Sequence, residues 1–294
     1  MKSILALTAL RLISFLPLRI ARLLGLVQGI VMAALRTKPY QVAKLNIALC
    51  YPDYSQQQVE TLAKARMIHL AQTLLETPRL WRKSADWLNQ KIVAVEGEVH
   101  LRQALDDDGG TILLMPHQGN WEVMGLCAAK QSTVTTLYKP PKLASLGDWI
   151  KRCREKTGAN LVPTNVRGVA ALLKALYRGE MAAILPDQQP AVNSGDFAPF
   201  FNVPALTMTL AHSLLDRSSS RAVFCCALRE KGGWRLHFLP ADPAIYSDDQ
   251  QLSLQAMNAG VEAIVALAPQ QYQWEYKRFR TQPEGSSKIY PVGI

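Results

Sequence analysis

One stretch of the sequence combines a base, an acid and a tight turn in an order that suits proton transfer. The apolar run Thr111–Met115 predicts a buried strand, and His117 follows it by two residues. Gly119 allows a turn, Asn120 can begin a helix, and Glu122 then falls in the first turn of that helix. A carboxylate beside an imidazole fixes its tautomer and stabilises the imidazolium. One interpretation of the sequence is therefore that Glu122 holds and charge-stabilises the His117 imidazole, as in a catalytic triad without its nucleophile.

The spacing by itself leaves a second interpretation open. Residues five apart on a continuous helix lie about 140° apart and do not meet, so the contact depends on the glycine turn. His237 and Asp242 have the same spacing, but they lie in a strand pattern that runs into Pro240 without such a turn. The alternative is a loop histidine beside a Glu122 that complements the helix dipole.

Two other polar positions are candidates for substrate contacts. Asp187 follows the predicted strand Met181–Leu185, and open α/β sheets bind ligands at the carboxyl ends of their strands. Arg154 lies in a predicted helix over residues 145–157, where a guanidinium either binds phosphate or faces solvent. His69 and His212 fall inside helical patterns and are interpreted as structural. No histidine or cysteine spacing predicts a metal site.

The elements around these positions alternate between strand and helix patterns, which predicts an α/β sandwich on a mixed sheet. A helix with a capping box begins at Ser55 and is predicted to end near Pro78. Further strands are predicted over residues 134–138 and 181–185, helices over 121–130, 145–157, 166–177, 207–217 and 252–267, and a hairpin over 222–228 and 234–239. Residues 38–294 are predicted to be one domain behind an N-terminal arm, residues 1–37.

The N-terminal arm is almost entirely apolar from Ser3 to Leu35, interrupted by three arginines. Arg11, Arg19 and Arg22 fall within about 80° of one another on a helical wheel. One basic stripe on an apolar helix is typical of an anchor lying in the plane of a membrane surface, with a break at Pro17. The alternatives are a helix packed on the protein core and a tilted span whose arginines reach the interface.

The charge distribution favours an anionic membrane surface, and the cysteine content favours a side of it that faces a reducing compartment. The net charge is +10, and seven basic residues precede the first acidic one, Asp53. Basic residues on an apolar segment suit an anionic lipid surface, so inner-membrane lipids are expected partners and nucleic acid is not. The five cysteines form no C-x-x-C pair, which favours a reducing compartment facing the cytosol.

An ordered set of motifs resembles one family. His117-Gln-Gly-Asn-Trp-Glu122 resembles the H-x4-D/E signature of glycerolipid acyltransferases, in the form found in lipid A biosynthesis acyltransferases, the late lauroyl and myristoyl transferases. Further segments resemble that family in the same order, namely Tyr138-Lys-Pro-Pro141, Arg152 with Arg154, Leu185-Pro-Asp-Gln188, Pro199-Phe-Phe201, and Tyr272-Gln-Trp274 followed by Lys277-Arg-Phe279. The resemblance covers roughly residues 38–290, with departures at Gln118 and Asn202.

The resemblance implies a function. It implies O-acyl transfer from an acyl carrier protein thioester to a hydroxyl of a lipid A precursor, on the cytoplasmic face of a bacterial inner membrane, without a cofactor or a covalent intermediate. His117 would be the catalytic general base and Glu122 its orienting carboxylate, and Arg154, Asp187, Gln188 and Asn120 would bind substrate. Alternatives are a same-family enzyme for another glycolipid, an ornithine lipid or an aryl-polyene lipid, and a non-catalytic membrane-attached protein. A further alternative is a metal hydrolase built on His117, Glu122, His212 and His237.

Overall fold

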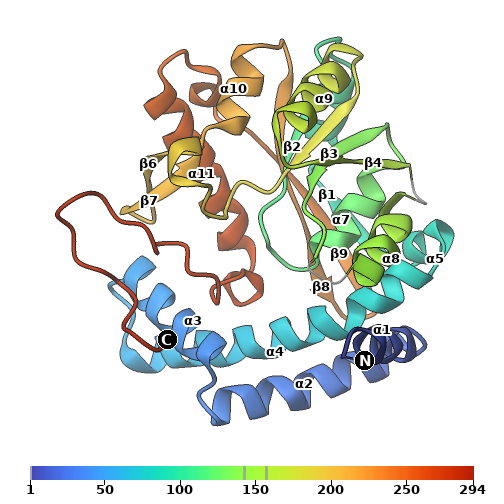
Figure 1. Cartoon of the computed structure of the whole chain (residues 1–294), viewed down its shortest axis with the longest axis vertical. Helices are drawn as coiled ribbons and strands as arrows, with labels where there is room; N and C mark the ends of the chain where they lie inside the picture. The colour runs from blue at the N-terminus through green and yellow to red at the C-terminus, as the bar shows by residue number, and fades with distance from the viewer. Residues whose placement is uncertain (1, 142–143, 156–157) are drawn as a thin grey trace.

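A seven-stranded, mostly parallel sheet forms the centre of the molecule in the computed structural model, which describes residues 2–141, 144–155 and 158–294. The strand order is β1-β9-β8-β2-β5-β3-β4, and a separate hairpin is formed by β6 and β7 (Figure 1). The strands are β1 Ile92–Glu96, β2 Thr111–Leu114, β3 Val134–Tyr138, β4 Ala159–Pro163, β5 Met181–Ile184, β6 Gly195–Phe200, β7 Val203–Met208, β8 Arg221–Glu230 and β9 Gly233–Pro240.

The pairing confirms the mixed α/β sheet. β2 pairs in parallel with both β5 and β8, β3 pairs in parallel with β4 and β5, and β1 pairs in parallel with β9. β8 and β9 are antiparallel, and this is the predicted hairpin. Because β2 and β5 are parallel neighbours, the residues that follow them emerge at the same edge of the sheet.

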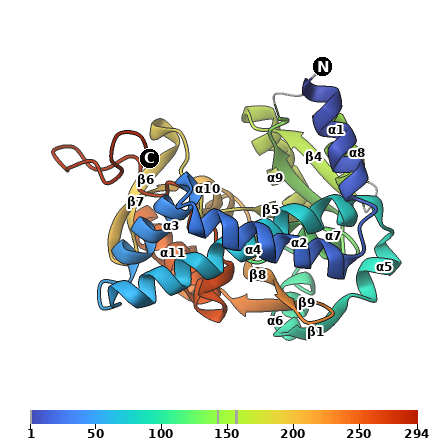
Figure 2. The ribbon, with the colours of Figure 1, turned by 90° about the horizontal axis from the view of Figure 1, so that it is seen from below.

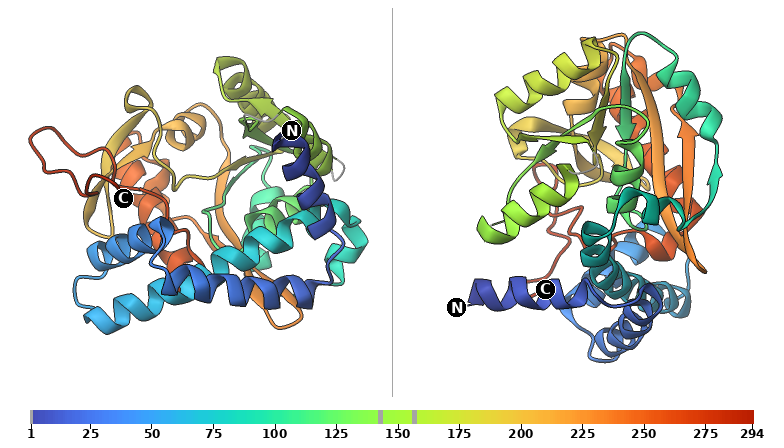
Figure 3. Two further views of the ribbon diagram at one scale, coloured as in Figure 1. Left: turned by 60° about the horizontal axis from the view of Figure 1, so that its bottom comes forward. Right: turned by 90° about the vertical axis from the view of Figure 1, so that its right-hand side faces the viewer.

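Helices cover both faces of the sheet (Figure 3). Along β2, Ile112 and Leu114 pack into one apolar cluster, whereas Leu113 packs into the other, as the alternation of a strand requires. The helices are α1 Lys2–Ile13, α2 Leu18–Ala34, α3 Lys38–Cys50, α4 Gln56–Arg82, α5 Ala85–Asn89, α6 Glu98–Leu105, α7 Trp121–Ala128, α8 Ala144–Glu155, α9 Val166–Tyr177, α10 Leu210–Asp216 and α11 Gln250–Leu267. The predicted helix over 145–157 is α8, and residues 156–157 lie outside the described part.

Two predicted element boundaries were wrong. α4 runs through Pro78 to Arg82, because Leu80 and Trp81 of its last turn are buried and tertiary packing outweighs the lost backbone hydrogen bond. The segment 207–217 was predicted to be helical throughout. Its first residues instead belong to β7, which pairs with β6, and α10 begins only at Leu210.

The N-terminal arm packs on α4 with small residues and exposes large ones. Ala21, Gly25, Gly29 and Ala33 are buried against α4, and a methyl group at Gly29 would lie 2.3 Å from the Ile68 Cα. Pro17 separates α1 from α2, as predicted. The exposed apolar residues of the arm include Leu12, Phe15, Ile20, Leu23, Leu24, Leu26, Val27, Ile30, Val31 and Leu35. Figure 2 shows α2 along the outer side of α4.

In the described ranges, no single helix has the length and apolarity to cross a bilayer. α2 and α3 are long and apolar enough only when they are taken together, and the chain bends by 77° between them. The predicted three-arginine stripe is wrong at Arg22. Its guanidinium turns inward to Glu76 and to the carbonyl of Gly233, while Arg11 and Arg19 are exposed.

Candidate active site

The loop after β2 holds His117 at the carboxyl edge of the sheet. Gly119 has φ +63°, and a Cβ at this position would lie 2.1 Å from the Ala227 carbonyl oxygen of β8, so only glycine fits without strain. The next backbone amide, that of Asn120, donates to the same carbonyl at 2.9 Å. The turn is therefore pressed against β8, which fixes the position of His117.

The carboxylate that contacts the imidazole is Asp187. Its Oδ1 lies 2.8 Å from the His117 Nδ1, and its Oδ2 accepts the His117 backbone N–H at 2.9 Å. Asp187 is buried at 3% exposure. Burial alone would raise the pKa of its carboxyl, but the His117 charge and hydrogen bonds outweigh this and hold the pKa below its ordinary value. An ionised Asp187 requires Nδ1–H, which leaves Nε2 as the proton acceptor.

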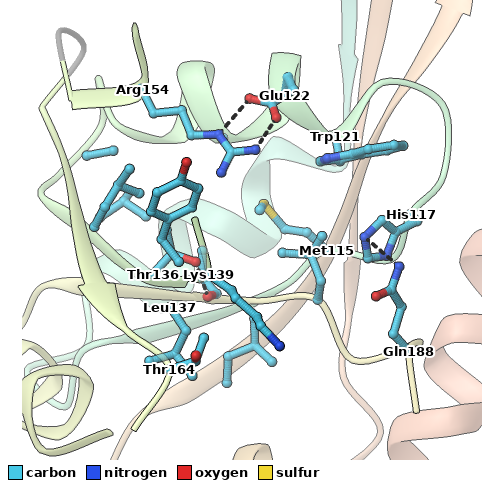
Figure 4. A pocket seen from close by; sticks show the side chains of 18 of the residues that line it. Met115, His117, Trp121, Glu122, Thr136, Leu137, Lys139, Arg154, Thr164 and Gln188 are labelled. Atoms are coloured by element: carbon cyan, nitrogen blue, oxygen red, sulfur yellow. Dashed lines mark hydrogen bonds and ion pairs between the residues drawn. The ribbon is translucent and has the colours of Figure 1, made fainter. Parts of the chain in front are cut away.

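The Nε2 side of the ring faces a cavity. The side-chain nitrogen of Gln188 lies 3.2 Å from Nε2 and also donates to the Gln273 side chain at 3.0 Å. Trp121 packs against the imidazole in a T-shaped contact, with ring centroids 4.9 Å apart. Figure 4 shows Gln188 directed toward His117 inside the cavity. A hydroxyl group that replaces the Gln188 contact would meet the lone pair of Nε2.

Glu122 has other partners, which corrects the expected contact with the imidazole. Its two carboxylate oxygens accept from the Arg154 guanidinium, through Nε at 3.0 Å and through a second short hydrogen bond, and the Trp81 indole N–H also donates to it. In Figure 4 the Glu122–Arg154 pair lies on a different side of the cavity from His117. The sequence did reveal Asp187, but not that the neighbouring strands β2 and β5 would bring it, rather than Glu122, to His117.

Arg154 is held in this position by charge. Burial lowers its pKa, but the Glu122 carboxylate more than compensates and the net pKa is raised. The guanidinium also lies over the Tyr138 ring, 5.4 Å from the centroid. Arg154 lines the cavity, as a substrate-binding residue must, so its side chain does not simply face solvent.

The cavity has a volume of about 620 Å³ and two chemically different ends. Six of its polar residues follow strands or begin helices at the carboxyl edge of the sheet, namely His117, Glu122, Lys139, Thr164, Gln188 and Gln189. Its apolar walls extend back along the sheet to Val134, the first residue of β3, and Ala159, the first residue of β4. From Tyr138 to Val134 this is about 13 Å of strand. The shape suits a long apolar group with a polar end.

Asn120 does not reach the cavity, so its predicted substrate contact is wrong. It is fully buried, and its side-chain amide lies 3.4 Å from Glu76 on α4. Glu76 also accepts from Arg22 and Arg229, while Thr73 donates to the Gly119 carbonyl. This cluster forms the rear support of the loop that carries His117.

The C-terminal segment contributes residues whose role the sequence did not reveal. The Gln273 backbone N–H donates to the His117 carbonyl at 3.1 Å, and Gln273 also holds Gln188. Burial, with Asp187 nearby, raises the pKa of Tyr272 well above its ordinary value. Tyr272, Trp274 and Phe279 are core residues.

The histidines of the metal-hydrolase alternative lie on other elements. His212 is on α10 and His237 on β9, and the described residues contain no group of three or more histidine, cysteine or acidic side chains placed to hold a metal ion. Asp242 caps the turn after β9 by accepting from the Ala244 N–H, rather than pairing with His237 as the equal spacing allowed.

One family of known proteins matches nearly the whole chain. The profile of the family described as bacterial lipid A biosynthesis acyltransferase matches residues 2–281. The chain is 29% identical over 261 residues to the lipid A biosynthesis palmitoleoyltransferase of Escherichia coli K12, covering 85% of this chain and 81% of that protein.

Two other relatives have names of the same kind. The E. coli K12 lipid A biosynthesis lauroyltransferase is 26% identical over 257 residues, covering 85% of this chain and 82% of the relative. A lipid A biosynthesis acyltransferase of Haemophilus influenzae is 25% identical over 279 residues, covering 94% of this chain and 86% of the relative. Because the family profile spans nearly the whole chain, the protein belongs to the bacterial lipid A biosynthesis acyltransferases.

Proposed function

We propose that the protein transfers a fatty acyl chain from an acyl carrier protein thioester to a hydroxyl group of a lipid A precursor. The observation that carries this proposal is the His117–Asp187 contact of 2.8 Å at the polar end of an otherwise apolar cavity. The family membership supplies the reaction class. The net charge of +10 suits an acidic carrier protein as donor.

In this mechanism His117 is the general base and Asp187 orients it. Nε2 takes the proton of the acceptor hydroxyl as its oxygen attacks the thioester carbonyl carbon. The C–S bond then breaks, the thiolate leaves, and the proton on Nε2 is returned to it. Asp187 keeps the proton on Nδ1 and stabilises the imidazolium between these two transfers. A thioester is already activated, so no acyl-enzyme intermediate is needed.

Glu122 and Arg154 are assigned a positioning role at the polar end. The Nε and one terminal nitrogen of Arg154 both donate to the Glu122 carboxylate, and this ion pair fixes the guanidinium beside the cavity. A guanidinium held in this way suits a phosphate or carbonyl oxygen of a substrate. Glu122 thus acts through Arg154, whereas Asp187 acts through His117.

We place the enzyme on the cytoplasmic side of a bacterial inner membrane, with α2 lying in the plane of the bilayer surface. The support is the outward face of α2, which carries Leu23, Leu24, Val27, Ile30 and Val31 in exposed positions. Monomeric soluble proteins rarely expose such a continuous apolar face. Exposed Arg11 and Arg19 lie on the same arm and suit anionic headgroups.

The activity is tested with purified protein in detergent, acyl carrier protein thioesters and a Kdo-bearing lipid A precursor, read by mass spectrometry. Wild type should add one acyl chain, and His117→Ala and Asp187→Asn should lose this activity. Glu122→Ala should be impaired through Arg154. Absence of transfer by folded wild type would reject the lipid A assignment and direct the assay to other glycolipids, ornithine lipids and aryl-polyene lipids. Coenzyme A thioesters in parallel identify the donor.

Membrane docking is tested by co-sedimentation with phosphatidylglycerol-containing vesicles. The double variant Leu23→Glu/Val27→Glu should lower vesicle affinity more than ten-fold, since each buried aliphatic side chain contributes about 1.5–3 kcal/mol. Val166→Glu is the matched control, because Val166 is equally apolar and more exposed but lies on α9. Equal binding by the double variant and wild type would refute docking through α2.

A further inference from the structure

Gly125 is a glycine inside a helix without the usual structural reason for one. Glycine in a helix interior is destabilising relative to alanine, so it is kept where a side chain has no room. Four other helix glycines follow that rule closely, and at a fifth, Gly147, a Cβ would lie 3.3 Å from the nearest neighbouring atom. A Cβ would meet a neighbouring atom at 2.7 Å at Gly25, 2.3 Å at Gly29, 1.8 Å at Gly168 and 2.2 Å at Gly260.

At Gly125 a Cβ would meet nothing within 4 Å, beyond its own helix backbone and chain neighbours. Its φ is also outside the left-handed region that favours glycine. No other helix glycine in the described ranges has such open space beside its Cα. Neither backbone conformation nor close packing therefore accounts for the residue.

The open space beside Gly125 is the cavity of the active site. Gly125 lines that cavity together with Leu126, Val134 and Leu161. α7 begins at the carboxyl edge of the sheet, and Gly125 lies one turn beyond Glu122, about 4.5 Å further along the helix axis. Gly125 therefore borders the apolar part of the cavity, beyond the ion pair of Glu122 with Arg154.

We propose that Gly125 is a specificity-determining residue that keeps the apolar part of the cavity open for the acyl chain of the donor. The inference rests on the proposed acyl transfer and deepens it by assigning the chain-length limit to one position. Bare helix backbone at Gly125 leaves room between α7 and the β3–β4 wall that any larger residue would fill. A side chain here shortens the space without touching His117 or Asp187.

The test compares donor profiles of wild type, Gly125→Ala and Gly125→Leu with carrier-protein thioesters from octanoyl to stearoyl. In Gly125→Ala, kcat/KM for the longest donor that wild type uses well should fall about four-fold relative to kcat/KM for a shorter donor. About four-fold is the factor that corresponds to burying one methylene group. In Gly125→Leu the ratio should fall more than ten-fold, and the optimum should move to a shorter chain. Leu161→Ala enlarges the opposite wall and should move the optimum to a longer chain.

The controls separate folding, function and specificity. Ala170→Leu places the same leucine side chain on an exposed face of α9 and should keep the wild-type profile. Thermal unfolding shows whether each variant is folded, and Gly125→Ala is the variant retained if the leucine variant is not. An unchanged profile in folded Gly125 variants overturns the inference while leaving acyl transfer intact. Failure of wild type with every donor overturns the proposed function and this inference with it.

Discussion

Two buried carboxylates support the loop that carries His117, and they differ in what surrounds them. Asp187 contacts His117 itself, and Glu76 contacts the loop from behind through Asn120. Both carboxylates are almost inaccessible to solvent. In each case burial raises the pKa, but cationic neighbours and hydrogen bonds leave it below the ordinary value.

The difference lies in the cation and its access to the cavity. Glu76 is paired with two guanidinium groups, those of Arg22 and Arg229, which stay charged and lie away from the cavity. Asp187 is paired with an imidazole whose second nitrogen faces the cavity. A carboxylate whose arginine partners lie away from the cavity, as at Glu76, supports structure, whereas one paired with an accessible imidazole can assist proton transfer.

The largest expected effect comes from Asp187→Asn. The amide cannot accept Nδ1–H and the backbone N–H as an anion does, so the tautomer and the imidazolium lose their support. We expect kcat to fall on the order of 10³–10⁴-fold, with a smaller change in the KM for the donor. Steady-state kinetics measure both constants. Activity within ten-fold of wild type would mean that Asp187 does not orient the base.

The corresponding change at the other carboxylate, Glu76→Gln, should act mainly on stability. It leaves two buried guanidinium groups without their counter-charge, and breaking such a pair costs about 3–5 kcal/mol of unfolding free energy. Denaturant unfolding measures this loss. Glu60→Gln is the matched control, because its ion pair with Lys44 lies at the surface, where solvent screens it, so its loss should be much smaller. Equal losses in the two variants would contradict a structural role for the cluster.

Arg22 and Arg19 separate core packing from membrane binding on the same helix. Arg22→Gln removes hydrogen bonds to Glu76 and Gly233 and should cost about 1–3 kcal/mol of stability, with vesicle affinity unchanged. Arg19→Gln should do the opposite. It should keep the stability and lower affinity for anionic vesicles about five-fold, corresponding to about 1 kcal/mol per basic residue. The reverse pattern would restore the three-arginine stripe predicted from the sequence.

The comparison also shows what the sequence could predict. Local patterns were sufficient for β3 and α9, whose predicted bounds agree with the structure, because an apolar run or a helical period is a property of neighbouring residues. The partner of His117 depends instead on which strands are adjacent. Glu122 is five residues away in sequence and Asp187 is seventy, yet the pairing of β2 with β5 brings Asp187 into contact.

The same limit applies to the residues behind the loop. Arg22 and Glu76 lie on two helices far apart in sequence, so the predicted arginine stripe took no account of a buried acid on α4. Gln273 reaches His117 from the C-terminal segment, and no local pattern marks it as part of a site. Local periodicity predicts elements, whereas site membership depends on contacts between elements.

The smallest expected effect concerns the acid side of the pH–stability profile. The pKa of Asp187 is lower in the folded protein than its ordinary value of 3.8, so the unfolded chain takes up this proton first. The stabilisation by Asp187 is therefore complete above that value and is lost as the pH falls toward the folded pKa.

Asp187→Asn removes the titrating group. The unfolding free energy of the variant should thus fall less steeply than that of wild type from about pH 5 to pH 3, by at most about 1.4 kcal/mol per pH unit. Denaturant titrations at several pH values measure the two slopes, and parallel slopes would mean that His117 does not stabilise the ionised Asp187 in the folded protein.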